Sequence, residues 1–228
     1  MALRLSCYAL MPLLVPVNEP ADGVEAVLAG RDPLVRAAPS AGAGKKDGPP
    51  VFDDHLQRVF RADASNRVWL TDIREHRTSE GKLYCCAIKQ AFSNRIVGYL
   101  ISDRMTAELA VEAACNAVAC RGEGVGCTLH ADGRSQFRSR AMAGELCRPD
   151  MVGSMGGVGV AGGNAAMEGF WPPLQSNVLN QQRWSTRHHL CLAIVVWIER
   201  KYHRQRAQDT FSGLTPIEFE TKPLTLAV

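Results

Sequence analysis

Three stretches near the middle of the chain have patterns typical of β-strands, and the first of them alternates its apolar residues. They cover residues 67–73, 82–88 and 95–102 and are rich in strand-forming residues. The first stretch places Asp72 at its end. Because only a short Ser93-Asn94 connection separates the second stretch from the third, we predict a hairpin there.

The second half of the chain alternates helix-like and strand-like segments. The predicted elements, in order, are an Ala-rich helix over 106–120, a strand over 127–131, a helix over 136–146, a strand over 151–154, a glycine-rich loop over 153–163, a helix from 164 and a long helix from 185 or 186 to about 206. Pro172-Pro173 should kink or restart the helix that begins at Asn164. A meander followed by strands with crossover helices predicts an α/β fold with a mixed sheet flanked by helices.

A chain of 228 residues can form one sizeable core with appendages. Residues 1–48 show no helical or strand period and are rich in Pro, Ala and Gly, so we predict a poorly ordered N-terminal arm and linker. Residues 49–66 would be a lead-in segment. Residues 67–228 would form the core, which ends in a basic helix.

Composition excludes several classes of protein. The net charge of +3 permits a polyanionic partner without requiring one. Since no run of about 18 apolar residues occurs, we expect no membrane span, and Pro12 and Pro16 argue against a signal peptide. None of the eight cysteines forms a C-x-x-C pair. We therefore expect reduced thiols in a cytoplasmic protein rather than disulfides or structural zinc.

Three carboxylates are the main candidates for chemistry. Asp132 directly follows a predicted strand, and Glu168 lies in a predicted helix that can pack across the ends of strands. With Asp72 they form a set of hard oxygen ligands that suits Mg²⁺. Two such ions about 3.5–4 Å apart can activate a water or a 3′-hydroxyl and stabilise the leaving oxygen in phosphodiester chemistry.

Other features have structural explanations. Residues 157–162 match G-x-G-x-x-G, but a dinucleotide site needs an acidic residue about 20 positions later, where Gln182 stands. We reject that site and expect a mobile loop instead. His130 is expected to be a hydrogen-bonded strand histidine. Core positions rather than base-stacking platforms are expected for three tryptophans: Trp171, Trp184 and Trp197.

From about residue 49 to residue 220, the chain resembles the catalytic subunit of bacterial insertion-sequence transposases with a retroviral-integrase-type core. The matching motifs include Trp69-Leu-Thr-Asp72, Ala91-Phe-Ser-Asn-Arg-Ile-Val-Gly98, Asp132-x-x-Ser-Gln-Phe137, Asn164-Ala-Ala-Met-Glu168 and Leu214-Thr-Pro-Ile-Glu-Phe219. Several ordered motifs are more specific than any one of them. The resemblance implies a ribonuclease H-like fold, with residues 67–228 as the integrase-type catalytic core.

The resemblance also implies a function. Asp72, Asp132 and Glu168 would bind two Mg²⁺ or Mn²⁺ ions and catalyse cleavage of DNA and strand transfer into target DNA. The implied partners are the element's terminal repeats, target DNA, further copies of the chain and an upstream helix-turn-helix protein. A basic helix end would contact DNA phosphates, although cations there also suit a helix C-terminus. Its residues are Arg200, Lys201, His203, Arg204 and Arg206.

The chain departs from the family pattern at several positions. The family usually has Asp in place of Gln90 and of Gly163, Gly in place of Arg134, and Ser in place of Gly169. The departures at Gln90, Arg134 and Gly163 favour an alternative, a truncated, catalytically inactive DNA-binding or oligomerising remnant. A third reading, a ribonuclease H-like nuclease acting on RNA or repair intermediates, is disfavoured because the flanking motifs match transposases.

Overall fold

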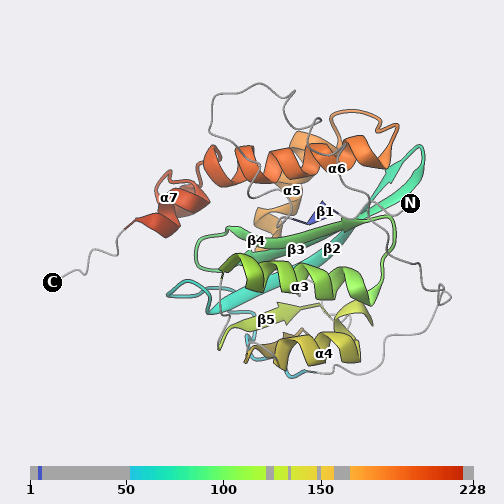
Figure 1. Ribbon diagram of the computed structural model, residues 1–228. Coiled ribbons are helices and arrows are strands. Elements are labelled where there is room, and N and C mark those ends of the chain that lie inside the picture. The colour runs from blue at the N-terminus through green and yellow to red at the C-terminus, as the bar shows by residue number, and fades with distance from the viewer. Residues whose placement is uncertain are drawn as a thin grey trace.

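In the computed structural model the chain folds into three layers, with helices covering both faces of a mixed sheet (Figure 1). The strand order is β1-β4-β3-β2-β5-β6. The structure describes residues 5–6, 52–121, 126–132, 135–147, 150–156 and 165–222. Apart from Leu5–Ser6 (β1), which pairs with β4, the predicted N-terminal arm lies outside these residues, as does the glycine-rich run 157–162.

The antiparallel meander is formed by β2 (Val68–Thr78), β3 (Gly81–Gln90) and β4 (Ile96–Ser102). The prediction that the first of these strands ends at Asp72 was wrong. β2 continues to Thr78 because its polar second half pairs with β3 as far as the Thr78–Gly81 register. Asp72 therefore lies inside a long strand, where its backbone is held by a neighbour.

The crossover from the meander to the parallel part of the sheet is made by α3 (Ala107–Arg121). It leads to β5 (Thr128–Ala131), which pairs parallel with β2, and β6 (Val152–Met155) pairs parallel with β5. Between these two strands lie η2 (Ser135–Arg138) and α4 (Arg140–Cys147). This arrangement confirms the predicted mixed sheet with crossover helices.

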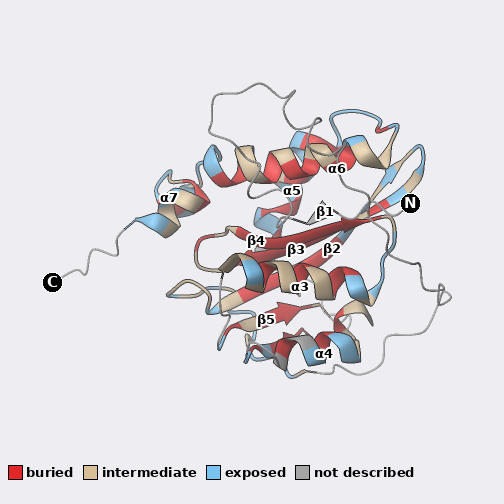
Figure 2. Cartoon of the chain, viewed as in Figure 1, coloured by how far each residue is buried: buried red, intermediate tan, exposed pale blue. Residues whose placement is uncertain are grey.

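A second group of helices covers the opposite face of the sheet (Figures 1 and 2). Its members are η3 (Ala165–Gly169), α5 (Trp171–Leu174), η4 (Gln175–Leu179), α6 (Arg187–Val196) and η5 (Trp197–Tyr202). The predicted helix around Glu168 is a short 3₁₀ turn. The chain then restarts at α5, where Pro172 and Pro173 occupy first-turn positions whose N–H groups would lack partners anyway.

The long helix formed by α6 and η5 begins where the sequence predicts. Thr186 is its N-cap, and the Thr186 side chain accepts a hydrogen bond from the His189 N–H at 3.1 Å. The last described elements are η6 (Asp209–Phe211) and α7 (Pro216–Thr221), and α7 begins with a capping box between Thr215 and Glu218.

Two apolar cores lie on either side of the sheet, as the buried strands in Figure 2 show. The predicted core tryptophans Trp171, Trp184 and Trp197 all belong to the core beneath α5 and α6. On the other face, Gly98 is required because a Cβ there would lie 2.6 Å from the Ala113 carbonyl of α3. The absence of a side chain at Gly98 lets α3 pack closely on β4.

In the described part of the chain, no helix is both long and apolar enough to cross a bilayer. The thiols of Cys85, Cys86, Cys127 and Cys191 are free and buried. Burial raises the pKa of each of them, which suppresses the reactive thiolate form.

Candidate active site

Asp72 is a buried carboxylate on the central strand β2, only 4% exposed. Its oxygens accept a hydrogen bond from the Ile73 N–H at 2.7 Å and form an ion pair with Arg74 Nε at 3.1 Å. The Arg74 guanidinium also lies over the Trp171 ring, 5.9 Å from its centroid. A carboxylate in the interior needs such partners to stay charged.

Asp132 lies beside Asp72 because the two flanking strands are neighbours. It directly follows β5, whose last residue, Ala131, is in register with Thr71 of β2. Both carboxylates also act on the same buried thiol. Burial raises the pKa of Cys86 to about 12, and the charges of Asp72 and Asp132 act in the same direction, against the hydrogen bond from Thr71. The fold thus brings the first two predicted ligands to one region.

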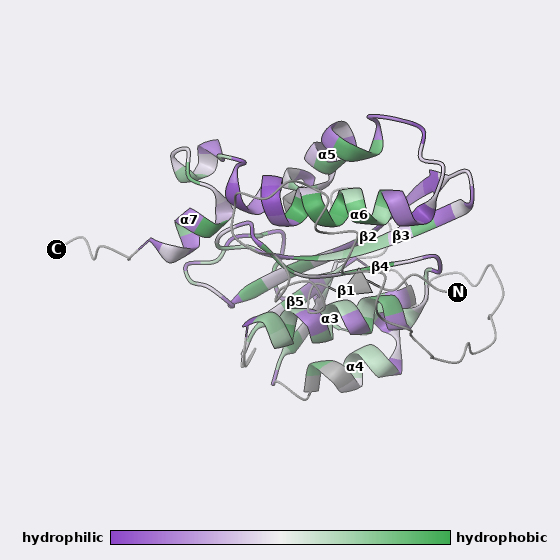
Figure 3. Ribbon diagram, turned by 45° about the horizontal axis from the view of Figure 1, so that its top comes forward, coloured by the Kyte–Doolittle hydropathy of each residue, from purple (hydrophilic) through white to green (hydrophobic). Residues whose placement is uncertain are grey.

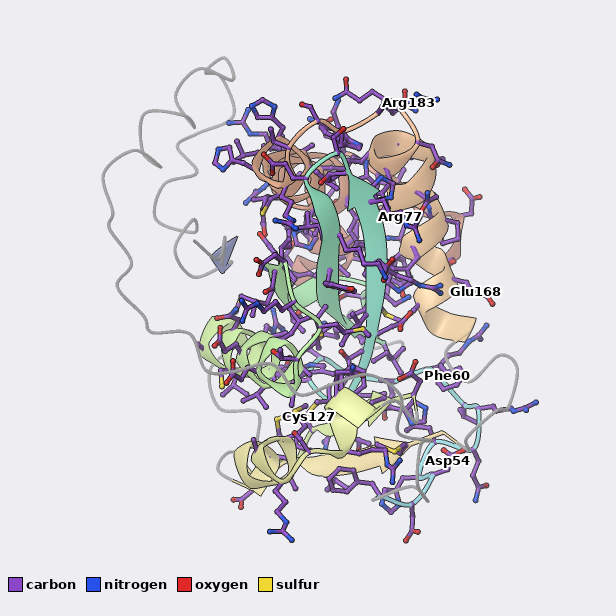
Figure 4. All side chains as sticks on the ribbon, turned by 90° about the vertical axis from the view of Figure 1, so that its right-hand side faces the viewer. Asp54, Phe60, Arg77, Cys127, Glu168 and Arg183 are labelled. Carbon is purple, nitrogen blue, oxygen red and sulfur yellow. The ribbon has the colours of Figure 1, made fainter. Side chains whose placement is uncertain are left out.

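Glu168 lies on η3, which contacts β2. The turn is held by Met167 and Phe170, both buried against the sheet, whereas Glu168 itself is exposed (Figure 4). Across the described residues, no three His, Cys, Asp or Glu side chains are close enough to form a metal-binding group. The fold therefore carries Glu168 to the neighbourhood of β2 without gathering all three carboxylates around one point.

Lys89 is a residue that the sequence reasoning missed. It lies on β3 in register with Leu70, is 2% exposed and belongs to the same face of the sheet as Asp72. Burial lowers the pKa of its amine to about 8. Its Nζ would be 3.5 Å from a Cβ at Gly169, the residue after Glu168. Its position at the end of an apolar run could have indicated that Lys89 is buried, but the predicted strand ended at residue 88.

Gln90, at a position where the resemblance predicts Asp, is enclosed by hydrogen bonds in the structure. Its Nε2 donates to Ser93 Oγ at 2.8 Å and to Glu220 Oε1 at 2.9 Å, and its Oε1 accepts from the Asn66 N–H at 2.9 Å. An Asp here would place a second negative charge against Glu220. Gln90 is thus a fully hydrogen-bonded part of this fold.

Only some residues of the predicted basic helix end are exposed to solvent. Lys201, Arg204 and Arg206 are exposed and Arg200 is half-buried. His203 is 3% exposed, and its ring contacts the Ile96 N–H and the Glu199 carboxylate. Because both ring nitrogens face the interior, His203 is removed from the set of residues expected to contact DNA. It fixes the end of the helix against β4.

A second group of cations lies at the far end of the β2–β3 hairpin. The segment before α6 is fastened to that hairpin by a hydrogen bond from the Ser79 N–H to the Trp184 carbonyl, 3.0 Å long. Figure 4 shows Arg77 and Arg183 on the side of the molecule that also carries Glu168. No local pattern groups these two arginines, because 105 residues separate them in the chain.

Comparison with known proteins supports this description. Residues 62–149 match the family model described as "Integrase core domain". The chain is 32% identical over 177 residues to the transposase InsF for insertion sequence IS3A of Escherichia coli K12, a match that covers 78% of this chain and 62% of the relative. It is 31% identical over 173 residues to the "Insertion element IS600 uncharacterized 31 kDa protein" of Shigella sonnei, covering 76% and 64%. The chain therefore spans somewhat less than two thirds of the curated relatives it matches.

Solved structures show the same fold. A chain of the simian T-cell lymphotropic virus intasome in complex with PP2A regulatory subunit B56 gamma has a TM-score of 0.53 at 14% identity, covering 80% of this chain and 62% of that one. The HTLV-2 integrase catalytic core domain in complex with magnesium, trimeric form, has a TM-score of 0.52 at 15% identity, covering 70% and 99%. The fold is ribonuclease H-like, residues 62–149 match the integrase core domain, and most of the chain is similar in sequence to bacterial insertion-sequence transposases.

Proposed function

We propose that this protein is a polynucleotidyl transferase that cleaves DNA at the ends of a mobile element and joins those ends to target DNA. The observation that carries the proposal is the placement of Asp72 on β2 and Asp132 at the end of the adjacent parallel β5, within an integrase core domain. Phosphodiester chemistry of this class needs clustered carboxylates rather than a protein nucleophile.

Asp72, Asp132 and Glu168 are the residues proposed to hold two Mg²⁺ or Mn²⁺ ions. Their donors are hard carboxylate oxygens, which suits both cations. The fit is supported at Asp72, whose carboxylate already lies against a cation, Arg74, and at Asp132 beside it. Magnesium accompanies the structurally similar HTLV-2 integrase core. When bound, the ions would supply an activated nucleophile and charge stabilisation at the phosphate.

DNA is the proposed substrate, both as the element's terminal repeats and as target. Arg200, Lys201, Arg204 and Arg206 would contact phosphates, since cations on one surface add sequence-independent affinity. Self-association is proposed as well, in line with the trimeric form of the similar integrase core. An upstream helix-turn-helix protein remains part of the proposal on the resemblance alone, and action in the cytoplasm remains part of it on the composition of the chain.

The proposal is tested with Asp72→Asn, Asp132→Asn and Glu168→Gln. Each variant keeps the size of the side chain but removes a charged ligand, so cleavage of DNA carrying the element ends should fall below detection. Binding of the same DNA, measured by fluorescence anisotropy, should stay near wild type. Asp63→Asn, at an exposed carboxylate, is the matched control. Near-full cleavage by any of the three variants would refute the assignment.

The alternative function is a DNA-binding or oligomerising remnant without catalysis, and the exposed position of Glu168 favours it. Thermal unfolding with and without millimolar Mn²⁺ separates the two. Stabilisation of the wild type, together with its loss in Asp132→Asn, supports the metal-dependent enzyme. Equal melting temperatures in all conditions support the remnant.

A further inference from the structure

The lead-in segment, residues 52–60, is fastened to β6, the edge strand that lies next to β5. The Met155 N–H donates to the Asp53 carbonyl at 3.2 Å, and the His55 N–H donates to Ser154 Oγ at 3.0 Å. An edge strand leaves backbone groups without a strand partner, and this segment supplies a partner for one of them. Residues expected only to lead into the core therefore cover an edge of its sheet.

Two aromatic contacts hold the same segment against β5 and β6. A Cβ at Gly153 would lie 2.7 Å from the Phe52 ring, so Phe52 packs on β6 where that strand has no side chain. At the other end of the segment, the ring centroids of Phe60 and His130 are 5.4 Å apart. Figure 4 shows Phe60 on the side of the molecule that also carries Glu168. The segment thus reaches from the edge of the sheet to the face with the candidate active site.

Ser154 joins the lead-in segment to His130 through one buried hydroxyl. Its Oγ lies 2.9 Å from His130 Nδ1, and both residues are 1% exposed. The prediction that His130 is a hydrogen-bonded strand histidine is thus confirmed. A serine hydroxyl has one donor and two acceptor positions, so Ser154 can bond His130 and the His55 N–H at the same time. Without the hydroxyl, two enclosed polar groups would each lose a partner.

His130 carries this attachment towards Asp132, which follows two residues later. The register partner of His130 in β2 stands two residues before Asp72, so the His130 and Asp72 side chains lie on one face of the sheet. β5 has only four residues, and a hydrogen bond from the Gly156 N–H to the Ala131 carbonyl, 3.1 Å long, holds its end next to Asp132. The position of that end therefore depends on β6 and on the segment fastened to β6.

We infer that Ser154 is a positioning residue, whose hydroxyl ties the lead-in segment to His130 and so sets where the Asp132 carboxylate stands beside Asp72. Because Ser154 is buried, it acts through His130 and the end of β5 without touching the substrate. The inference rests on the proposed function only for the role of Asp132 as a metal ligand. The hydrogen bonds of Ser154 themselves form without metal.

The first test is amide hydrogen exchange of the full chain without metal, read at single residues by NMR. In Ser154→Ala, exchange of the His55 and Gly156 amides should rise about fivefold, the ratio expected for one hydrogen bond of ordinary strength. Exchange in the β2–β3 ladder should not change. Ser102→Ala is the matched control, because Ser102 is a buried serine on β4 whose Oγ likewise accepts a backbone N–H, that of Arg104 at 3.2 Å. If Ser154→Ala does not fold, Ser154→Cys replaces it, since a thiol bonds only weakly.

The second test connects the Ser154 hydroxyl to the metal site. The midpoint of a Mn²⁺ titration, followed by the melting temperature, should move to a severalfold higher concentration in Ser154→Ala and stay unchanged in Ser102→Ala. In a His130→Leu background, Ser154→Ala should move the midpoint no further, because the link that it breaks is already absent. A further shift of the same size in that background would show that Ser154 does not act through His130, which overturns the inference.

The two tests fail in distinguishable ways. Unchanged exchange at Gly156 in folded Ser154→Ala overturns the inference, and so does a Mn²⁺ midpoint equal to that of the wild type. If exchange at Gly156 rises but Mn²⁺ stabilises neither protein, the link from the hydroxyl to the end of β5 is supported while the proposed metal-dependent function fails.

Discussion

Asp72 is a buried carboxylate that is paired with a positive charge. The carboxylate accepts from the Ile73 N–H and pairs with Arg74, which itself lies over Trp171. The side chain of Arg74 is 55% exposed, so solvent weakens the ion pair between Arg74 and Asp72. Of the two side chains, only that of Asp72 is buried. Arg74 thus places a positive charge where a divalent cation is proposed to bind.

Replacing Arg74 by Ala should strengthen the binding of Mn²⁺, because the cation would no longer compete with a guanidinium for Asp72. The midpoint of a Mn²⁺ titration, followed by the melting temperature, should move to lower concentration by several-fold. Without metal, the variant should lose only about 0.5–1 kcal/mol of stability. Arg77→Ala, on the same hairpin, is the control. An unchanged or weakened midpoint in Arg74→Ala would show that the guanidinium and the ion do not share Asp72.

At the scale of elements, α7 is held to the core by a buried carboxylate. Glu220 accepts hydrogen bonds from Arg95 at 2.9 Å, from Gln90 at 2.9 Å and from Arg121. Its side chain is 8% exposed. The short helix is thereby joined to the end of β3, the residue before β4 and the end of α3, all about 100 or more residues earlier in the chain.

Glu220→Gln should destabilise the protein by about 3 kcal/mol, because two enclosed arginines lose their counter-charge. Chemical denaturation at neutral pH measures this change. Asp209→Asn, an exposed acid in the same part of the chain, should have little effect. Equal stability of Glu220→Gln and wild type would mean that α7 is not anchored by this cluster.

The contribution of Glu220 should also depend on pH. Burial raises the pKa of Glu220, but hydrogen bonds from Arg95 and Gln90 and the charge of Arg121 bring it below the ordinary value of 4.5. The unfolded chain therefore binds a proton more readily than the folded one. The stability advantage of wild type over Glu220→Gln should be complete above about pH 5 and disappear as the pH falls through the lowered pKa.

At the scale of the whole molecule, charge gathers at the two ends of the long α6–η5 helix. In Figure 3 this helix is hydrophobic in its middle and hydrophilic at both ends. One end carries Arg200, Lys201, Arg204 and Arg206, and the other, next to the hairpin, carries Arg183 and Arg187. The net charge of +3 thus understates two local cationic surfaces.

The salt dependence of DNA binding should tell which surface meets the phosphates. Changing Arg200, Lys201, Arg204 and Arg206 to Gln should reduce the slope of log K against log salt by about 3–4, if all four contact phosphates. The matched variant changes four cations at the hairpin end: Arg77, Lys82, Arg183 and Arg187. A reduced slope in this second variant alone would place the DNA across the hairpin end and contradict the proposed contacts.

Much of the fold could be predicted from local patterns. The strand-forming residues of 82–88 and 95–102, the Ala-rich run to Cys120 and the Thr186 cap correspond to β3, β4, α3 and the start of α6. Local patterns did not predict where β2 ends, because strand pairing sets that end. Residues 74–78 are polar, yet they extend β2 because β3 runs alongside them. The short 3₁₀ form of η3 likewise follows from how Met167 and Phe170 pack on the sheet.

The sequence by itself determined the order of elements, the mixed sheet and the choice of Asp72, Asp132 and Glu168 as one group of candidate ligands. These features follow from hydrophobic period, helix caps and motif spacing, which are properties of residues near one another in the chain. Only the tertiary structure decided which polar groups are enclosed. His203 and Gln90 are buried because their partners, Ile96 and Glu220, come from distant segments, and Lys89 is buried beside Gly169, which is also distant in the chain. A charge in the interior is tolerated or excluded according to the groups around it, and those groups are set by folding rather than by adjacency in the chain.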